Sequence, residues 1–170
     1  MKATEIAKVE TEVQISAVAA LAGEIWRDHY TPIIGAEQVE YMLDKFQSEE
    51  AIGEQIASGC EYYLVLDGGE NAGYIAVVPD RSARNMKLSK IYIHKSRRGR
   101  GLGKAALRFA EDLCSRCGYG KLWLTVNKHN AGSIQWYERM GFVNAGPAIV
   151  AIGGGFVMDD YIMEKPLESG

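Results

Sequence analysis

The sequence lacks most of the features that mark a secreted or membrane-bound protein. Its three cysteines are an odd number and it has no Asn-x-Ser/Thr sequon, so nothing indicates a disulfide-bonded, glycosylated domain. No apolar run comes near the roughly 18 residues of a membrane span, and the most apolar early segment, residues 15–23, follows two glutamates instead of a basic region. We therefore expect a cytoplasmic protein that makes no membrane contact.

The sequence also has no internal repeat, no linker-like stretch and no low-complexity segment. Its 170 residues are 47% hydrophobic and 24% charged, which is an ordinary composition for a compact domain with a sizeable core. We therefore expect residues 1–170 to form a single domain.

Acidic residues are absent from one long stretch of the chain. Residues 81–110 hold ten Lys or Arg and no Asp or Glu, which leaves 9 of the 19 basic residues, against all 22 acidic ones, for the rest. Charge focused in this way argues against general nucleic-acid binding and favours one anion site, for which a polyphosphate is a suitable ligand. A solvated basic surface on a strand and a helix would explain the same residues.

Hydrophobic patterning predicts a mixture of strands and helices. Apolar residues recur at helical spacing from Val18 to Ile25, and Pro32 and Gly35 are expected to end this first helix. Residues 67–69, Asp-Gly-Gly, are a strong hairpin signal. In chain order we expect strand 3–9, helices within 13–29, 39–46 and 48–59, strands 61–66, 73–78 and 87–94, helix 102–117, strand 122–126, helix 133–140, and strands 142–152 and 156–163.

A glycine-rich loop joins the strand at 87–94 to the helix that begins at Leu102. The loop reads Arg98-Gly99-Arg100-Gly101-Leu102-Gly103-Lys104, so the N–H groups and the positive dipole end of the helix would lie beside glycines and three cations. Glycine lets the backbone come close to a phosphate and adopt positive φ. The loop therefore predicts a phosphate site.

Two other phosphate-binding motifs do not fit this spacing. A Walker loop needs Gly and then Ser or Thr at positions where this chain has Arg98 and Ala105. A dinucleotide fingerprint needs Gly-x-Gly-x-x-Gly, whereas Gly99, Gly101 and Gly103 are evenly spaced by two. A nucleoside triphosphatase and a dinucleotide-binding enzyme are therefore disfavoured.

A second motif lies downstream of the loop and reads Asn127-Lys-His-Asn130-Ala-Gly-Ser133-Ile-Gln-Trp-Tyr137-Glu-Arg-Met-Gly141-Phe142. With Arg98-x-x-Gly101-x-Gly103 after a strand, it resembles the GNAT superfamily of N-acetyltransferases. The resemblance implies an α/β (α+β) fold with a mixed, mostly antiparallel seven-stranded sheet, splayed central parallel strands and helices on both faces. It covers the element order from residue 3 to 167, and the first 60 residues match only in outline.

The resemblance also implies a co-substrate, acetyl-CoA, and the residues that hold it. The diphosphate would lie on the loop, the pantetheine amides would pair with strand backbone, Asn130 would contact the cofactor arm, and the Tyr137 phenol would protonate the departing thiolate. The implied catalytic residue is Tyr137, and the implied cofactor-binding residues are Ile91, Ile93, Arg98, Gly99, Arg100, Gly101, Leu102, Gly103, Lys104, Asn130 and Ser133. From the residues alone, Tyr137 would also suit a core position beside Trp136, and Asn130 a helix N-cap.

The base that accepts the amine proton stays open at this point. Many relatives have a Glu near the start of the strand before the glycine loop, where this chain reads Met86-Lys87-Leu88. The remaining candidates are His94, Asp159, Asp160 or a chain of water molecules. A backbone N–H near Ile93 would hold the oxyanion.

Other notable residues give weaker signals. Cys114 and Cys117 are interpreted as packing residues, and the three histidines are too scattered for a metal site, so no metal is expected. An acidic helical region, residues 37–54, and three aromatic residues beside it would suit a cationic acceptor, although a solvated surface and helix burial explain them equally. The aromatic residues are Trp26, Tyr30 and Tyr41.

The resemblance therefore implies an N-acetyltransferase that transfers the acetyl group of acetyl-CoA to a primary amine, expected to be a small amine substrate. An amino acid, an aminoglycoside-like sugar and a protein N-terminus stay open as acceptors. Direct transfer in a ternary complex is expected because no activated Cys or Ser nucleophile is apparent. The alternative is a non-catalytic CoA-binding regulatory module, which the Lys87 substitution would suit. A homodimer could form by pairing of residues 148–152 across a two-fold axis.

Overall fold

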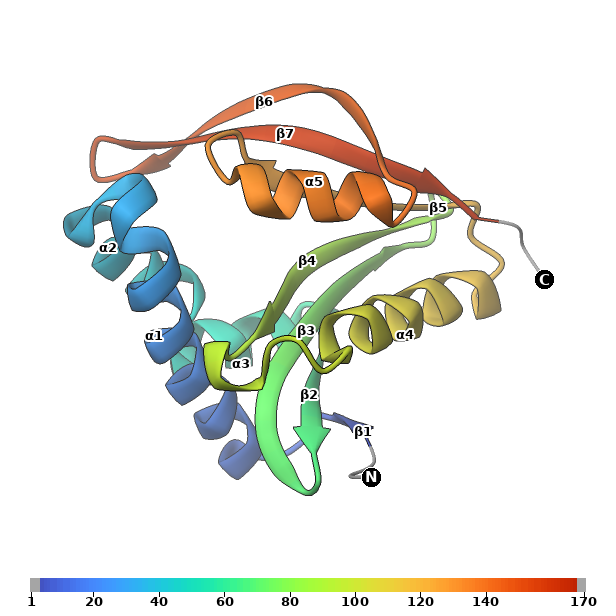
Figure 1. The fold of residues 1–170 in the computed structure, drawn as a ribbon, viewed down its shortest axis with the longest axis horizontal. Coiled ribbons are helices and arrows are strands. Elements are labelled where there is room, and N and C mark those ends of the chain that lie inside the picture. Colours follow the sequence, from blue (N-terminus) through green and yellow to red (C-terminus); the bar gives the residue numbers. More distant parts are fainter. Residues whose placement is uncertain (1–3, 168–170) are drawn as a thin grey trace. The chain divides into compact units, whose positions relative to one another are not determined.

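The computed structural model describes residues 4–167, which alternate between strands and helices (Figure 1). The elements are β1 (Thr4–Lys8), α1 (Glu12–Ile34), α2 (Ala36–Phe46), α3 (Glu49–Ala57), β2 (Glu61–Asp67), β3 (Glu70–Asp80), β4 (Asn85–Ile93), a short 3₁₀ turn η1 (Lys95–Arg97), α4 (Leu102–Arg116), β5 (Lys121–Asn127), α5 (Ala131–Arg139), β6 (Val143–Gly153) and β7 (Phe156–Pro166). Every strand and helix expected from the patterning is present, in the expected order.

The described chain divides into two compact units. The first holds residues 4–78 and 90–110, and the second holds residues 79–89 and 111–167. Strands β3 and β4 and helix α4 contribute residues to both units. Within residues 4–167, no helix combines the length and the apolar character that crossing a bilayer requires.

The strands form a seven-stranded sheet in the order β1-β2-β3-β4-β5-β7-β6. The β1–β2, β2–β3, β5–β7 and β6–β7 pairs are antiparallel, and β4 pairs with β5 in parallel. The parallel register covers Asn85–Lys87 against Lys121–Trp123 and ends before Leu88 and Leu124. The mixed, mostly antiparallel sheet with parted central strands is therefore confirmed.

Two adjacent tyrosines show that the sheet of the first unit carries helices on both faces. Successive residues of a strand point to opposite faces. In β2, Tyr62 donates a hydrogen bond to Gln55 of α3 at 2.5 Å, whereas the ring of Tyr63 lies against Phe109 of α4 with ring centroids 4.8 Å apart. Helices α3 and α4 therefore cover opposite faces.

Helix α1 begins with a reciprocal cap and runs further than the sequence predicts. The Thr11 hydroxyl accepts the Gln14 N–H, and the Gln14 side chain accepts the Thr11 N–H at 3.0 Å. The helix continues through Pro32 and ends at Gly35, which has a φ of +87° and donates its N–H to Thr31. Pro32 lies in the last turn, where only one intrahelical hydrogen bond is lost, so the expectation that it ends the helix is wrong.

Glycines have two different roles in β3 and in the turn before it. Gly68 and Gly69 turn the chain with φ values of +60° and +86°. Further along β3, a Cβ atom on Gly73 would lie 2.2 Å from the carbonyl oxygen of Tyr92 in β4. Only glycine therefore allows β3 to approach β4 at this point.

The second unit packs α5 and the end of α4 against its strands. Figure 1 shows α5 beside the β6–β7 hairpin. At the end of α4, Cys114 is fully buried and its thiol lies 3.3 Å from the carbonyl oxygen of Lys121, whereas Cys117 is exposed. Cys114 is the packing residue that the helical stripe predicts, and the same interpretation is wrong for Cys117.

Candidate active site

The glycine loop connects the end of β4 to the first turn of α4. Gly99 and Gly101 have φ values of +80° and +78°, and a Cβ added to either would meet no atom within 4 Å. The Ala105 N–H bonds to the carbonyl of Gly101 at 3.0 Å, so the N–H groups of residues 102–104 belong to the unsatisfied first turn of the helix. An open loop with positive φ at two glycines and with unpaired helix N–H groups fits a diphosphate.

The start of α4 is held in place by its buried side. Leu102 is 3% exposed and Ala106 is fully buried, while Gly99, Arg100, Gly101 and Lys104 are exposed. The helix therefore presents its N-terminal turn to solvent with its apolar side fixed beneath it. The predicted loop residues, from Arg98 to Lys104, come together in the first unit.

The cations of the loop are not equivalent. Arg98 donates from Nε to the carbonyl oxygen of Ile93 at 3.3 Å, which ties the loop to the end of β4. Arg100 bonds instead to the Asp67 carboxylate at 3.0 Å, and the same carboxylate oxygen accepts a bond from Arg97 at 3.1 Å. Arg97 also pairs with Glu70. The sequence motif identifies Arg100 as a phosphate ligand and gives no sign of its carboxylate partner.

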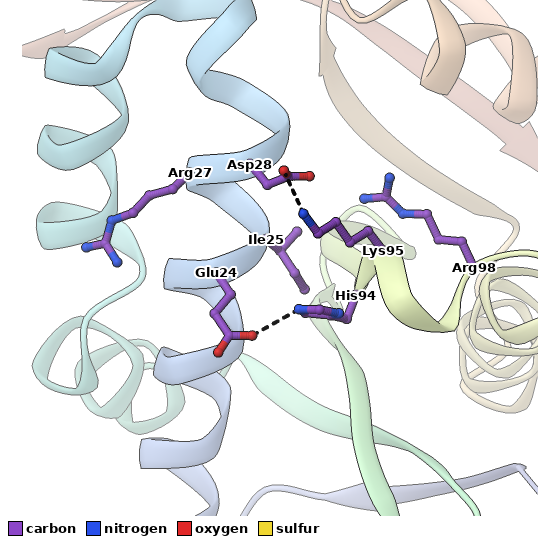
Figure 2. Close-up of a pocket in the computed structure, with 7 residues that line it drawn as sticks. All are labelled: Glu24, Ile25, Arg27, Asp28, His94, Lys95 and Arg98. Carbon is purple, nitrogen blue, oxygen red and sulfur yellow. Dashed lines mark hydrogen bonds and ion pairs between the residues drawn. The ribbon is translucent and has the colours of Figure 1, made fainter.

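A cavity of about 470 Å³ lies between α1 and the segment that follows β4. In Figure 2, His94 reaches Glu24 and Lys95 reaches Asp28, with distances of 3.0 Å from Nε2 to Oε2 and 3.1 Å from Nζ to Oδ1. Arg27 points away from these pairs and binds Glu40. The residues lining the cavity are Glu24, Ile25, Arg27, Asp28, His94, Lys95 and Arg98.

The contacts of His94 weaken its candidacy as a base. Its Nε2 is paired with Glu24, and its Nδ1 lies 2.8 Å from the Ser96 hydroxyl and accepts the Ser96 N–H at 3.2 Å. Both ring nitrogens therefore have partners, one in α1 and one at the start of the loop.

The backbone of β4 turns one edge away from β3 at the two predicted strand positions. The His94 N–H bonds to Ala72 in β3 at 2.8 Å, whereas the Ile93 carbonyl is bonded by Arg98. Because backbone groups alternate in direction along a strand, Ile91 and Ile93 direct their N–H groups to the side opposite β3. This is the orientation that pairing with an extended amide chain requires.

In the second unit, α5 carries the second group of predicted residues. Tyr137 is 8% exposed, and its ring centroid lies 5.2 Å from that of Trp136 and 5.5 Å from that of Phe142. Asn130 is 4% exposed and occupies the N-cap position, but its side chain makes no capping hydrogen bond. Its buried amide is thus not explained by helix capping. Ser133 lies half-buried in the first turn of the same helix.

The two aspartates of β7 differ in their surroundings. Asp159 forms an ion pair with Lys128. Asp160 is 6% exposed, and burial raises its pKa to about 6, although a hydrogen bond with Thr125 and the charge of Lys87 act in the opposite direction. Lys87 is therefore close enough to Asp160 for its charge to lower the pKa of that carboxyl group. Burial thus brings the pKa of Asp160 toward the range that a general base needs near neutral pH.

The aromatic residues of α1 form a cluster with two tyrosines of the sheet. Trp26 is buried, with its ring centroid 4.3 Å from Tyr30 and 5.7 Å from Tyr92, and Tyr92 lies 5.4 Å from Tyr74. Tyr41 lies apart, beside Lys45. Trp26 therefore belongs to the core of the first unit, and Tyr30 is a half-buried residue packed against it.

Sequence reasoning missed a buried lysine in β4. Lys90 is 7% exposed, and its Nζ donates to the Phe46 carbonyl at 2.6 Å, to Gln55 Oε1 at 3.1 Å and to the Tyr62 hydroxyl. Burial lowers the pKa of Lys90 to about 7. Its position in a strand whose buried face also includes Met86 and Leu88 was the available signal.

No three His, Cys, Asp or Glu side chains within residues 4–167 converge as metal ligands.

Comparison with known proteins identifies the family. An uncharacterised N-acetyltransferase of Lactobacillus delbrueckii subsp. lactis is 26% identical over 164 residues, which cover 92% of this chain and 94% of that protein. Streptothricin acetyltransferase of Streptomyces lavendulae is 36% identical over 98 residues, 58% of this chain and 52% of the relative. The crystal structure of PaiA N-acetyltransferase from Thermoplasma acidophilum in complex with coenzyme A has the same fold, with a TM-score of 0.80 at 22% identity over 96% of this chain and 99% of that one.

The family model for the acetyltransferase (GNAT) family matches residues 20–142, a span that includes the glycine loop and α5. That span holds the open backbone at Gly99 and Gly101 and the buried Asn130 and Tyr137. The chain therefore belongs to the acetyltransferase (GNAT) family and is an acetyl-CoA-dependent N-acetyltransferase.

Proposed function

We propose that this chain acetylates a primary amine on a small molecule by direct transfer from acetyl-CoA, with residues 1–170 acting as one catalytic domain. The amine nitrogen attacks the thioester carbonyl, the carbon–sulfur bond breaks, the amine gives up a proton and the thiolate receives one. The observation that carries the proposal is the open glycine loop at the N-terminus of α4, which suits the diphosphate of the donor.

Each predicted residue receives a role in this proposal. The N–H groups of the loop from Arg98 to Lys104 bind the diphosphate, and the outward backbone at Ile91 and Ile93 pairs with the pantetheine amides. Asn130 and Ser133 contact the cofactor arm. Tyr137 protonates the leaving thiolate, because a phenol of pKa about 10 can donate to a thiolate of conjugate pKa about 8.5.

Asp160 is proposed as the base. An alkyl amine with a pKa near 10.4 needs roughly 4.6 kcal/mol to become neutral at pH 7, so a proton acceptor is required. With its pKa raised to about 6 by burial, Asp160 is mostly ionised at pH 7 and still basic enough to help. Asp159, which is paired with Lys128, and His94, which is paired with Glu24, are less suited.

The printed name of one relative and the charge of two helices support a class of acceptor. Streptothricin acetyltransferase is named for a small molecule, and the acidic surface of α2 and α3 would attract a cationic amine. We propose a cationic small-molecule amine, with streptothricin, a polyamine, an aminoglycoside and free amino acids as the compounds to compare. We also propose a cytoplasmic location, and a homodimer formed through the exposed Ile149 and Val150 of β6.

A thiol-release assay over this amine panel tests the proposal. The wild type should release CoA with at least one amine, and Tyr137→Phe should lose about 100-fold in kcat while binding CoA as before. Equal turnover of Tyr137→Phe would remove Tyr137 from catalysis. In the wild type kcat/KM should rise with pH through an apparent pKa near 6, and this acidic limb should vanish in Asp160→Asn. If it persists, another group is the base.

The same experiments separate the alternative of a non-catalytic CoA-binding module. Both readings require CoA to stabilise the fold, by about 2.7 kcal/mol at 100 times its Kd. A thermal shift without turnover on any amine would favour the module. No thermal shift at all would contradict both.

A further inference from the structure

A buried carboxylate outside the glycine loop, that of Asp67, binds two arginines at the loop. Asp67 is the last residue of β2 and only 5% of its surface is exposed. A single oxygen, Oδ2, accepts hydrogen bonds from Arg97 at 3.1 Å and from Arg100 at 3.0 Å. These two arginines lie on either side of Arg98 and Gly99, so one carboxylate ties together both ends of that segment.

The energetics of this contact favour ordering of the loop. Burial alone would raise the pKa of Asp67, but hydrogen bonds from Arg97 and Arg100 outweigh burial and lower its pKa. The carboxylate is therefore ionised at neutral pH, and its bonds to the two guanidinium groups are charge-assisted. Glu70, on the other side of the Gly68-Gly69 turn, adds a second bond to Arg97. The two carboxylates that flank the β2–β3 turn thus bind the arginines on both sides of Gly99.

The backbone of the loop explains why such a grip is needed. Gly99 and Gly101 both adopt positive φ, and glycine has the largest freedom to leave that conformation. An untethered loop of this composition would lose conformational entropy when it bound a ligand, and that cost would weaken binding. Tethering the arginines on both sides of Gly99 removes part of this cost beforehand.

We propose that Asp67 is a positioning residue for the co-substrate: through Arg97 and Arg100 it preorganises the loop that binds the diphosphate of acetyl-CoA. Asp67 itself does not touch the ligand. Its negative charge repels the phosphates, so its effect on binding is the sum of a favourable ordering effect and an unfavourable charge. This inference rests on the proposed function of the loop and deepens it.

The two effects have opposite signs, which makes the proposal testable with Asp67→Asn. Asparagine keeps the size and one acceptor oxygen but loses the charge. Preorganisation predicts that the Kd for CoA, measured by calorimetry, rises about tenfold, the loss expected from weakening one charge-assisted bond. A Kd equal to or lower than that of the wild type would overturn the proposal, because it would mean that only the repulsive charge matters.

A truncated donor separates positioning from general damage to the fold. With acetyl-CoA and an amine that the wild type accepts, Asp67→Asn should raise KM for the donor about tenfold and leave kcat within about twofold. With acetyl-pantetheine, which lacks the diphosphate, kcat/KM should match the wild type. An equal loss with both donors would overturn the proposal.

Matched variants complete the test. Glu61→Gln removes a carboxylate from the other end of the same strand, where it pairs with Lys8 and Tyr63, and should leave the Kd for CoA unchanged. If Asp67→Asn does not fold, Arg97→Lys keeps the charge but replaces the planar fork, whose two nitrogens reach Asp67 and Glu70 separately, by a single ammonium group. It should raise the Kd in the same way, and an unchanged Kd would overturn the proposal. Failure of the wild type to bind CoA would instead overturn the proposed function and this inference with it.

Discussion

Two buried charges in the first unit are accommodated in opposite ways. Asp67 meets two guanidinium groups, which keep it ionised. Lys90 meets a carbonyl, an amide oxygen and a phenol, none of which carries a negative charge, and burial lowers its pKa to about 7. The comparison teaches that hydrogen bonds alone do not replace a counter-charge in a desolvated place.

The difference follows from position along the chain. Asp67 stands at the end of a strand beside an arginine-rich loop, where partners of opposite sign are available. Lys90 lies inside β4, on the face that also buries Met86 and Leu88. Its ammonium contacts the last carbonyl of α2 and the Gln55 side chain of α3. The charge of Asp67 therefore helps to order the groups around it, whereas the charge of Lys90 is disfavoured by its surroundings.

The largest effect on stability is expected when the charge of Asp67 is removed. Asp67→Asn leaves Arg97 and Arg100 charged but without the ionised partner that they share, so the melting temperature at pH 7 should fall more than in any other variant of this comparison. Differential scanning calorimetry measures it. A melting temperature within error of the wild type would show that the arginines find other partners and would weaken the contrast with Lys90.

The next effect concerns the pH dependence of stability set by Lys90. Its pKa is about 7 in the folded chain and about 10.4 when unfolded, so the unfolded chain binds more protons in between and the free energy of unfolding should rise with pH. The expected gain between pH 7 and 8.5 is about 1.5 kcal/mol. Urea titrations at several pH values measure this slope, which Lys90→Met should abolish. A parallel slope in the variant would assign the effect to other groups.

Lys90→Met should also be as stable as the wild type or more so at pH 7, by about 1 kcal/mol, which is the opposite sign to Asp67→Asn. The reason is that the neighbours remain satisfied without the lysine. The Phe46 carbonyl still accepts from Gln55 Nε2 at 3.0 Å, and Gln55 Oε1 still accepts from Tyr62. Urea denaturation at pH 7 measures it. A clear loss of stability would mean that the ammonium is a net stabilising group.

The smallest effect on the melting temperature is expected at Glu70, the exposed carboxylate beside Arg97. Glu70 also pairs with Arg97, but its side chain is 64% exposed, whereas that of Asp67 is 7% exposed. Glu70→Gln should therefore change the melting temperature much less than Asp67→Asn, and added salt should erase the change. Equal losses in the two variants would show that burial of the carboxylate is not what distinguishes them.

The sequence predicted what depends on local pattern. The spacing of Val18 to Ile25 predicted helix α1, and the Asp-Gly-Gly turn predicted the hairpin. Three glycines between a strand and a helix predicted an open loop at this junction. These features arise from periodicity and backbone preference, both of which act over a few residues. The extension of α1 through Pro32 escaped prediction because a cap at Gly35 outweighs the loss of one hydrogen bond.

Features that depend on distant partners were not predictable in the same way. Asp67 was visible only as a turn residue, because its arginines lie 30 and 33 positions away in the chain. Lys90 looked like one more member of a basic stretch: its alternation with Met86 and Leu88 indicates a buried strand face, but the partners of its ammonium in α2 and α3 lie 35 to 44 positions away in the chain. The raised pKa of Asp160 likewise arises from the strands packed around it.

The close approach at Gly73 has a consequence for engineering this enzyme. Any larger residue there would collide with the Tyr92 carbonyl and push β4 sideways, together with the backbone edge at Ile91 and Ile93. Codon 73 should accordingly be held constant in any mutant library of this enzyme, because a side chain there would move the backbone of β4 whatever other position was varied.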